Sequence, residues 1–271
     1  MKNFYLIGND LDRSLSPYIH DWIYKFLDIK AEYRNKNIQA INFEMELSNI
    51  ISKLKLGSIQ GLNITSPYKI KIISPNIELS DDAQSIGAVN CINYKDNHLI
   101  GDNTDWIGFV QSINQGKVNL NNYDIKIIGA GGSARAIIYG LGKLGIEKFK
   151  IYNRTKTSII VNGIRYRTFY LEELRESLSK NIFLINCIKP NLINNILTNN
   201  DLDSMQFFYD LNYNRVQFHD TLEQKDIKVI LGLDMLIYQA IKSIEIWLEY
   251  DFFDKINKEE IKTYLNKKSL C

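Results

Sequence analysis

Residues 124–144 read DIKIIGAGGSARAIIYGLGKL, and this stretch decides the fold. Its first five residues are mainly apolar and predict a strand, and the residues from Ser133 to Leu144 predict a helix. Between the two lies a glycine-rich turn with the pattern G-x-G-x-x-A, formed by Gly129, Ala130, Gly131, Gly132, Ser133 and Ala134. Glycines here permit a tight turn and let a pyrophosphate approach the backbone at the helix N-terminus. In this strand–turn–helix context, the pattern favours a dinucleotide site over a plain connection between two elements.

The turn after the next predicted strand, 149–152, indicates which dinucleotide is bound. It reads Asn153-Arg154-Thr155-Lys156. A site for NAD normally places a carboxylate here to bond the ribose hydroxyls, but this turn offers a guanidinium, an ammonium and a hydroxyl. Because a guanidinium suits bidentate binding of a phosphate, the turn predicts NADP, with the 2′-phosphate as its ligand. An exposed basic turn without a ligand is the alternative that the turn taken alone leaves open.

Strands and helices alternate on both sides of this unit, which predicts an α/β fold. Further apolar stretches extend a parallel, doubly wound sheet, and these lie at 182–187, 207–211 and 229–231. The first third of the chain has its own alternating pattern, with strands expected at 4–8 and 61–65, helices at 17–27, at 43–54 and from Pro67, and a hairpin over 88–102. Two amphipathic helices are expected over 234–249 and after Asp254. With 271 residues, the chain is long enough for two domains, each with its own core.

The composition narrows the class of protein. The net charge is +2, from 33 basic and 31 acidic residues spread along the chain, which argues against nucleic acid as a partner. No apolar run approaches the ~20 residues of a membrane span, so no membrane association is expected. The three cysteines (Cys91, Cys187 and Cys271) and the three scattered histidines show neither CxxC nor HExxH spacing. We therefore expect no metal site and no disulfide framework, and a cytoplasmic protein.

Polar residues gather at the ends of several predicted elements. In GLNITSPYK, Asn63 and Thr65 point to the same face of a strand, and Lys69 follows the strand end. Such a cluster is suited to binding a polar ligand, and the alternative is an ordinary polar turn with a solvent-exposed lysine. Ser16, and either Thr104 or Asp105, stand where helix N-caps belong, so capping is the alternative to a binding role there.

The order of the polar motifs is more informative than any one of them. SLSPxxH, GLNxTxPxK, GAVN, GDNTDxxG, GAGGxARA, NRT and GxxMLxxQA follow one another from residue 14 to residue 240. In this order and at these spacings they resemble shikimate dehydrogenases. The resemblance implies NADPH-dependent reduction of 3-dehydroshikimate to shikimate, a step in chorismate and aromatic amino acid biosynthesis. Two alternatives stay open: an enzyme of the same family that also uses quinate, and a non-catalytic member that senses NADP or a shikimate-like ligand.

The resemblance also implies how the chain is organised. It implies a substrate-binding and catalytic domain over residues 1–105, with C-terminal helices over 238–271 packing back on it, and a Rossmann-like NADP-binding domain over residues 106–237. Two stretches depart from the family's pattern, NCIKPN at 186–191 and LNYNR at 211–215. The oligomeric state stays open between a monomer and a homodimer.

The family's functional residues carry over to the matching positions of this chain. The resemblance implies that Lys69 and Asp105 form the catalytic pair and that Ser14 and Ser16 bind the substrate carboxylate. The ring hydroxyls are expected to contact Asn63, Thr65, Asn90, Asp105 and Gln239. The cofactor is expected to contact the glycine turn, the basic turn, Gly232 and Met235. Hydride arriving at a ketone carbon builds negative charge on the oxygen, and the ammonium of Lys69 is suited to stabilise and protonate that oxygen.

Overall fold

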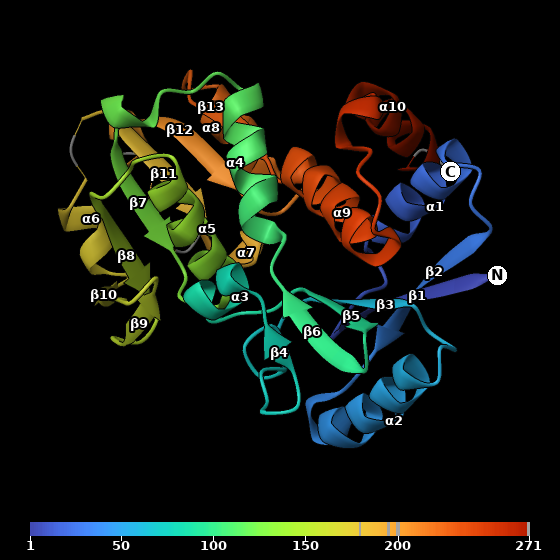
Figure 1. Cartoon of the computed structure of the whole chain (residues 1–271). Helices are drawn as coiled ribbons and strands as arrows, with labels where there is room; N and C mark the ends of the chain where they lie inside the picture. Colours follow the sequence, from blue (N-terminus) through green and yellow to red (C-terminus); the bar gives the residue numbers. More distant parts are fainter. Residues whose placement is uncertain (179, 194–195, 199–200, 270–271) are drawn as a thin grey trace. The chain divides into compact units, whose positions relative to one another are not determined.

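The computed structural model describes residues 1–178, 180–193, 196–198 and 201–269. The chain divides into two compact units, the first formed by residues 1–108 together with 236–271 and the second by residues 109–235. Each unit is built on its own sheet (Figure 1). Cys271, the end of the C-terminal segment assigned to the first domain, lies outside the described residues.

The first unit contains a mixed sheet with the strand order β2-β1-β3-β5-β6-β4. Its strands are β1 (Lys2–Gly8), β2 (Ala31–Asn37), β3 (Gly61–Ile64), β4 (Glu78–Leu79), β5 (Cys91–Lys95) and β6 (His98–Asp102). β1 pairs in parallel with β2 and with β3, while β5 and β6 form the predicted antiparallel hairpin. Asp96 and Asn97 at its tip have φ values of 50° and 67°, the conformation that tight hairpin turns require.

Helices pack on both sides of this sheet, with α2 on one side and α1, α9 and α10 on the other (Figure 1). The helices of this unit are α1 (Ser16–Phe26), α2 (Phe43–Lys55), α3 (Asp81–Ile86), α9 (Leu233–Leu248) and α10 (Lys258–Ser269). Trp247 of α9 stacks on Phe4 with 4.7 Å between ring centroids and donates its indole N–H to the carbonyl of Ile92. Tyr264 of α10 bonds the carboxylate of Asp21 at 3.0 Å. The C-terminal helices therefore pack on the N-terminal strands and α1, as the resemblance implied.

Two local predictions for this unit are wrong. Ser16 is the first residue of α1 and Leu15 holds the N-cap position, so Ser16 does not cap the helix. No helix starts at Pro67, where the chain runs through a series of turns. The carbonyl oxygen of Lys69, which a helix would use for a residue four positions on, accepts instead from the N–H of Val89 at 2.8 Å. This bond holds Lys69 next to Val89, which lies just before β5.

The second unit contains a sheet with the strand order β13-β12-β11-β7-β8-β10-β9. Its strands are β7 (Asp124–Ile128), β8 (Phe149–Asn153), β9 (Ser158–Val161), β10 (Ile164–Tyr170), β11 (Ile182–Asn186), β12 (Met205–Asp210) and β13 (Lys228–Leu231). Its helices are α4 (Asp105–Gln115), which starts in the first unit, α5 (Gly132–Lys143), α6 (Glu173–Glu176), α7 (Pro190–Ile193) and α8 (Gln217–Glu223). Apart from β9 the paired strands are parallel, which confirms the predicted Rossmann-like sheet.

A hairpin of β9 and β10 follows the basic turn, and the sequence interpretation missed it. Asn162 and Gly163 join the two strands with φ values of 51° and 75°. An Asn-Gly pair between apolar stretches is the strongest short-range signal for such a hairpin. β10 then pairs in parallel with β8, so the connection between these neighbouring strands contains a strand instead of a crossover helix.

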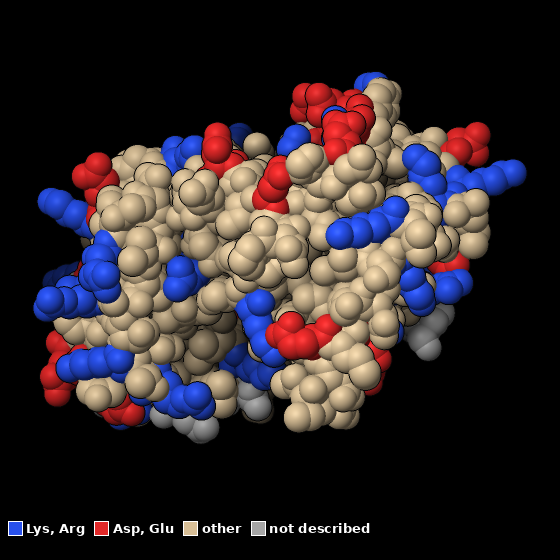
Figure 2. Space-filling view, turned by 60° about the horizontal axis from the view of Figure 1, so that its bottom comes forward, with Lys and Arg blue, Asp and Glu red and all other residues tan. Residues whose placement is uncertain are grey.

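Each unit has its own buried core, one including Ile7, Phe43 and Leu62 and the other Ile128, Leu184 and Phe208. Short 3₁₀ helices lie at Ala40–Asn42, Leu120–Asn122, Asp201–Ser204 and Phe253–Lys255. Within the described residues, no helix has the length and apolar character needed to cross a membrane. On the face shown in Figure 2, basic and acidic side chains are interspersed with uncharged surface.

Candidate active site

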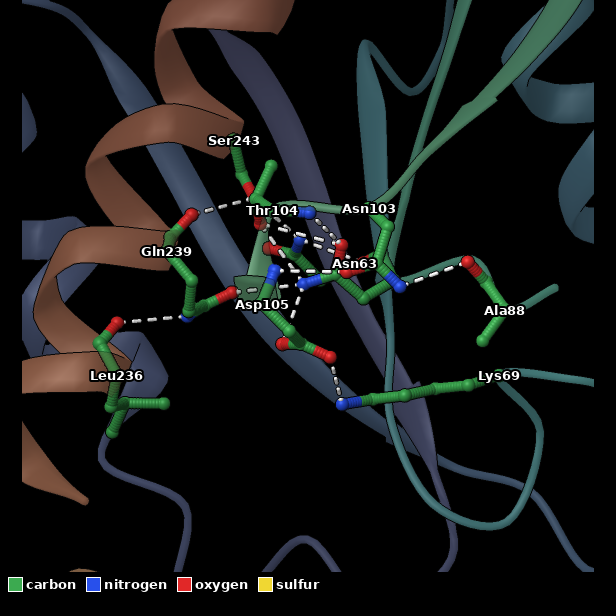
Figure 3. A network of polar contacts seen from close by, with 10 residues as sticks. Asn63, Lys69, Ala88, Asn103, Thr104, Asp105, Leu236, Gln239 and Ser243 are labelled. Carbon is green, nitrogen blue, oxygen red and sulfur yellow. Dashed lines mark hydrogen bonds and ion pairs between the residues drawn. The ribbon is translucent and has the colours of Figure 1, made fainter. Parts of the chain in front are cut away.

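Lys69 and Asp105 form an ion pair inside the first unit. Lys69 Nζ lies 2.6 Å from Asp105 Oδ2, and the two side chains are only 11% and 7% exposed. Lys69 comes from the turns after β3, while Asp105 is the first residue of α4. The sequence placed these residues 36 positions apart, and the fold brings their charged groups into contact (Figure 3). A short, mostly buried ammonium–carboxylate pair is a suitable arrangement for proton donation to a bound ligand.

Asn90 holds the second oxygen of that carboxylate. Its amide nitrogen lies 2.9 Å from Asp105 Oδ1, 2.9 Å from Thr104 Oγ1 and 3.3 Å from Gln239 Oε1. Its amide oxygen accepts from the backbone N–H of Thr104 at 2.7 Å, which assigns the amide orientation. Because one oxygen of Asp105 contacts Lys69 and the other contacts Asn90, both carboxylate oxygens are held in place.

Asn63 is held just as tightly. Its amide nitrogen donates to the carbonyl of Asn90 at 3.0 Å and to Ser243 Oγ at 2.9 Å, while its oxygen accepts from the hydroxyl of Tyr33 at 2.9 Å. Both amide hydrogens are therefore used within the protein. What remains for a ligand is the second lone pair of the oxygen, which can accept a hydrogen bond.

Ser243, Tyr33 and Thr104 complete this network, and none of them was assigned to the site from sequence. Ser243 Oγ lies 3.1 Å from Thr104 Oγ1 and donates to the carbonyl of Gln239 at 3.0 Å (Figure 3). Ser243 could have been predicted from its spacing, because it lies four residues after Gln239 and so on the same face of α9. Tyr33 had no such signal. Its ring stacks on His20 with 3.7 Å between centroids, and burial raises the pKa of its phenol, which keeps the hydroxyl a donor.

Ser14, Ser16 and Thr65 stand apart from these hydrogen bonds. Ser14 Oγ accepts from the backbone N–H of Ser16 at 3.3 Å, and Ser16 itself is 5% exposed. The methyl group of Thr65 packs where a Cβ on Gly8 would otherwise lie. In the described part of the chain, these three hydroxyls are not bonded to the cluster around Asp105.

The glycine turn in the second unit has the properties of a phosphate site. Gly131 occupies the N-cap position of α5 without any side-chain cap, and a Cβ built there would meet no atom within 4 Å. Gly129 has a φ of +107°, and Ala134 is fully buried against the sheet. The backbone at Gly131 thus leaves open space beside the start of α5, as binding of a pyrophosphate requires.

The basic turn contains two cations with different surroundings. Arg154 is exposed at the end of β8, and Asn153 shapes the turn by donating to the carbonyl of Thr155 at 3.0 Å. Lys156 Nζ lies 2.8 Å from Glu173 Oε1 and sits over the ring of Tyr170. Glu173 raises the pKa of Lys156 through a hydrogen bond, and Lys156 lowers the pKa of Glu173 in the same way. One of the two cations expected to bind phosphate is therefore already paired with a carboxylate.

Gly232 has a packing role in this structure. A Cβ at that position would lie 2.1 Å from the carbonyl oxygen of Leu211, so only glycine permits this approach of β13 to the loop after β12. Met235 is 7% exposed. Within the described residues, no group of three or more His, Cys, Asp or Glu side chains is arranged to hold a metal ion.

Comparisons with known proteins agree in the family they indicate. Residues 6–92 match the family model of the shikimate dehydrogenase substrate binding domain. A shikimate dehydrogenase (NADP(+)) from Caldicellulosiruptor bescii is 34% identical over 262 residues, covering 92% of this chain and 90% of the relative. The crystal structure of shikimate dehydrogenase 1 from Peptoclostridium difficile matches with a TM-score of 0.85 at 29% identity, covering 100% and 98% of the two chains. A shikimate dehydrogenase solved in complex with NADP+ matches with a TM-score of 0.76 at 27% identity, covering 99% and 96%.

Proposed function

The chain belongs to the shikimate dehydrogenase family, and from this premise we propose how its residues carry out the reaction. It is an NADP-dependent oxidoreductase that reduces 3-dehydroshikimate to shikimate, reversibly, in aromatic biosynthesis. The single observation that carries the catalytic assignment is the Lys69–Asp105 pair, 2.6 Å apart and mostly buried.

Lys69 acts on the carbonyl oxygen of the substrate. When bound, NADPH supplies a hydride to the ketone carbon at C3, and the electron pair of the C=O bond moves onto oxygen. The ammonium of Lys69 stabilises that charge and donates a proton to the oxygen, so that an alcohol forms and Lys69 regains its proton from water. A positioned acid of this kind accelerates such a step roughly 10²–10⁴-fold.

Asp105 orients the ammonium of Lys69, and its carboxylate also accepts a hydrogen bond from a ring hydroxyl of the substrate. Asn90 holds this carboxylate at 2.9 Å, so its direction is set before the substrate binds. Preorganised groups of this kind cost no rearrangement at the moment of reaction. The hydrogen-bonded network of Asn63, Asn90, Thr104 and Ser243 therefore holds the catalytic pair in place.

The substrate is held by the first unit, which we assign as the substrate-binding domain. Ser14 and Ser16 bind its carboxylate, and its ring hydroxyls contact Asn63, Thr65, Asn90, Asp105 and Gln239. The network refines one of these contacts. Because both amide hydrogens of Asn63 are already donated, a ring hydroxyl donates to Asn63 Oδ1 and does not accept from Nδ2.

The second unit is the NADP-binding domain in this proposal. The pyrophosphate rests on the N–H groups at the start of α5, above Gly131, where the structure leaves open space. Arg154 and Thr155 bind the 2′-phosphate, and Lys156 contributes less because Glu173 already holds its ammonium at 2.8 Å. The carboxylate typical of NAD sites is absent from the basic turn itself.

The test is absorbance of reduced nicotinamide with purified protein and shikimate, comparing NADP with NAD. We expect rapid reduction of NADP, with NAD far behind. Lys69→Ala should lose at least 100-fold in kcat, the lower range for a positioned acid. Lys71→Ala is the matched control, since Lys71 lies two residues away in an exposed ion pair with Glu44. Near-full turnover of Lys69→Ala would refute its role, and shikimate binding without reduction of either cofactor would favour the sensor alternative.

Two further properties belong to this proposal. We place the enzyme in the cytoplasm, because Cys91 and Cys187 form no disulfide within the described residues, as expected in a reducing compartment. It acts as a monomer or a homodimer. Light scattering coupled to gel filtration measures which of these states the protein adopts, and a larger assembly would contradict both.

A further inference from the structure

A buried carboxylate at the end of β12 has four hydrogen-bond donors around it. Asp210 is 0% exposed. Its Oδ1 accepts from Asn186 Nδ2 at 3.0 Å and from the backbone and side-chain nitrogens of Asn212 at 3.0 and 2.6 Å. Its Oδ2 accepts from His219 Nε2 at 2.9 Å. A carboxylate this deeply buried is tolerated only when its oxygens are bonded in this way.

The surroundings of His219 determine which of its nitrogens carries the proton. Its Nδ1 accepts a hydrogen bond from the backbone N–H of Val216 at 3.1 Å. The hydrogen of the neutral ring therefore resides on Nε2, which faces Asp210. His219 is also 0% exposed, so this bond is shielded from water. His219 thus links the start of α8 to the end of β12.

The same network joins the loops after β11 and β12. Asn186 and Asn212 both donate to the carbonyl of Ile188, at 3.1 and 2.8 Å, and the N–H of Leu211 donates to the carbonyl of Asn186. These loops contain the two stretches that depart from the family's pattern. The departures are therefore bridged by side-chain amides and one buried carboxylate.

The loop after β11 lies directly against the glycine turn. A Cβ on Gly129 would be 3.1 Å from Ile188 Cγ2 and 3.3 Å from Cys187 Cβ, and the N–H of Cys187 bonds the carbonyl of Ile128. β7, β11 and β12 are adjacent parallel strands, and ligands of open α/β sheets bind outside the carboxyl ends of such strands. A shift of the 186–188 loop would therefore move the wall of the dinucleotide site.

We propose that His219 is a positioning residue for the cofactor: its Nε2–H holds Asp210, and through Asn186 and Asn212 it sets the 186–188 loop against Gly129. The proposal rests on the NADP-binding function proposed above and deepens it. His219 contacts neither the substrate nor the cofactor. Its loss should weaken NADP binding and leave the Lys69–Asp105 chemistry in the first unit unchanged.

The experiment compares three variants by steady-state kinetics and by direct titration with NADP. His219→Ala should raise KM and Kd for NADP at least tenfold, with kcat within about threefold of wild type and KM for shikimate unchanged. His219→Gln should recover part of the affinity, because an amide can still donate to Asp210. Leu222→Ala is the matched control, since Leu222 lies on the same helix α8, is 0% exposed and belongs to the apolar core. It should lower Tm without raising KM for NADP.

Two results would overturn the proposal. One is a KM for NADP within twofold of wild type in His219→Ala. The other is an equal rise in Leu222→Ala at an equal loss of Tm, which would make the effect a general consequence of instability. If His219→Ala does not fold, His219→Phe, which keeps a ring in the same space but cannot donate to Asp210, decides by the same thresholds in the NADP titration. Wild-type protein that binds no NADP at all would instead refute the proposed function.

Discussion

His20 makes the stability of the first unit depend on pH. It is 0% exposed, its ring stacks on Tyr33, and its Nδ1 lies 3.1 Å from the hydroxyl of Tyr24. Its Nε2 is buried and has no hydrogen-bond partner among the described residues, so the doubly protonated ring would carry one N–H without an acceptor. Burial lowers the pKa of His20 from 6.5 to about 3. The folded protein therefore keeps this ring neutral at a pH where the unfolded chain protonates it.

The sign and size of the effect follow from proton linkage. Between pH 6.5 and pH 3 the unfolded state binds one more proton at His20 than the folded state, so the free energy of unfolding falls as pH falls. Each pKa unit corresponds to about 1.4 kcal/mol. From pH 7 to pH 5 the loss attributable to His20 is about 2 kcal/mol, and it reaches about 4 kcal/mol at pH 3.

Urea unfolding followed by tryptophan fluorescence measures this loss selectively. The three tryptophans, Trp22, Trp106 and Trp247, all lie in the first unit with His20. His20→Phe keeps an aromatic ring against Tyr33 but cannot titrate, so groups that titrate in both proteins cancel in the difference. Wild type should lose about 2 kcal/mol more than the variant between pH 7 and pH 5. A difference that stays within about 0.5 kcal/mol over this range would refute the reasoning.

Four substitutions test other parts of the structure. Ser243→Ala removes a partner of Asn63, so KM for shikimate should rise roughly fivefold, the equivalent of about 1 kcal/mol, and an unchanged KM would contradict the network's role. Arg154→Ala should lower kcat/KM for NADP about 10–100-fold and leave kcat/KM for NAD unaffected. Lys156→Met should lower kcat/KM for NADP less than about threefold, because Glu173 holds the ammonium. Equal losses in the two variants would show that both cations bind phosphate. Gly232→Ala should lower the free energy of unfolding by about 1–3 kcal/mol, since the new Cβ would meet a backbone carbonyl at 2.1 Å, and an unaltered Tm would count against that contact.

Much of the fold was predictable from local pattern. β7 spans the predicted residues 124–128, and β5 and β6 form a hairpin within the predicted residues 88–102. The failures have identifiable causes. The helix expected from Pro67 does not form because the carbonyl of Lys69 accepts from the N–H of Val89. Val89 is 20 residues away, so the local sequence does not predict this hydrogen bond. The hairpin of β9 and β10 was predictable from Asn162-Gly163 but was not recognised.

Within the site, the sequence by itself determined which residues are present and which backbone conformations they permit. The glycine turn is the clearest case, because φ at Gly129 and the lack of a Cβ at Gly131 are local properties. The resemblance of the motifs to the family likewise predicted Lys69 and Asp105 as the catalytic pair.

Only the tertiary structure decided how these side chains are held. Asn63 and Ser243 are 180 residues apart in the chain, and their hydrogen bond determines that Asn63 can only accept from a ligand. Lys156 belongs to the basic motif, yet Glu173, 17 residues on, already holds its ammonium in an ion pair. Hydrogen-bonding capacity is finite, so a side chain's role depends on what its distant neighbours have already used.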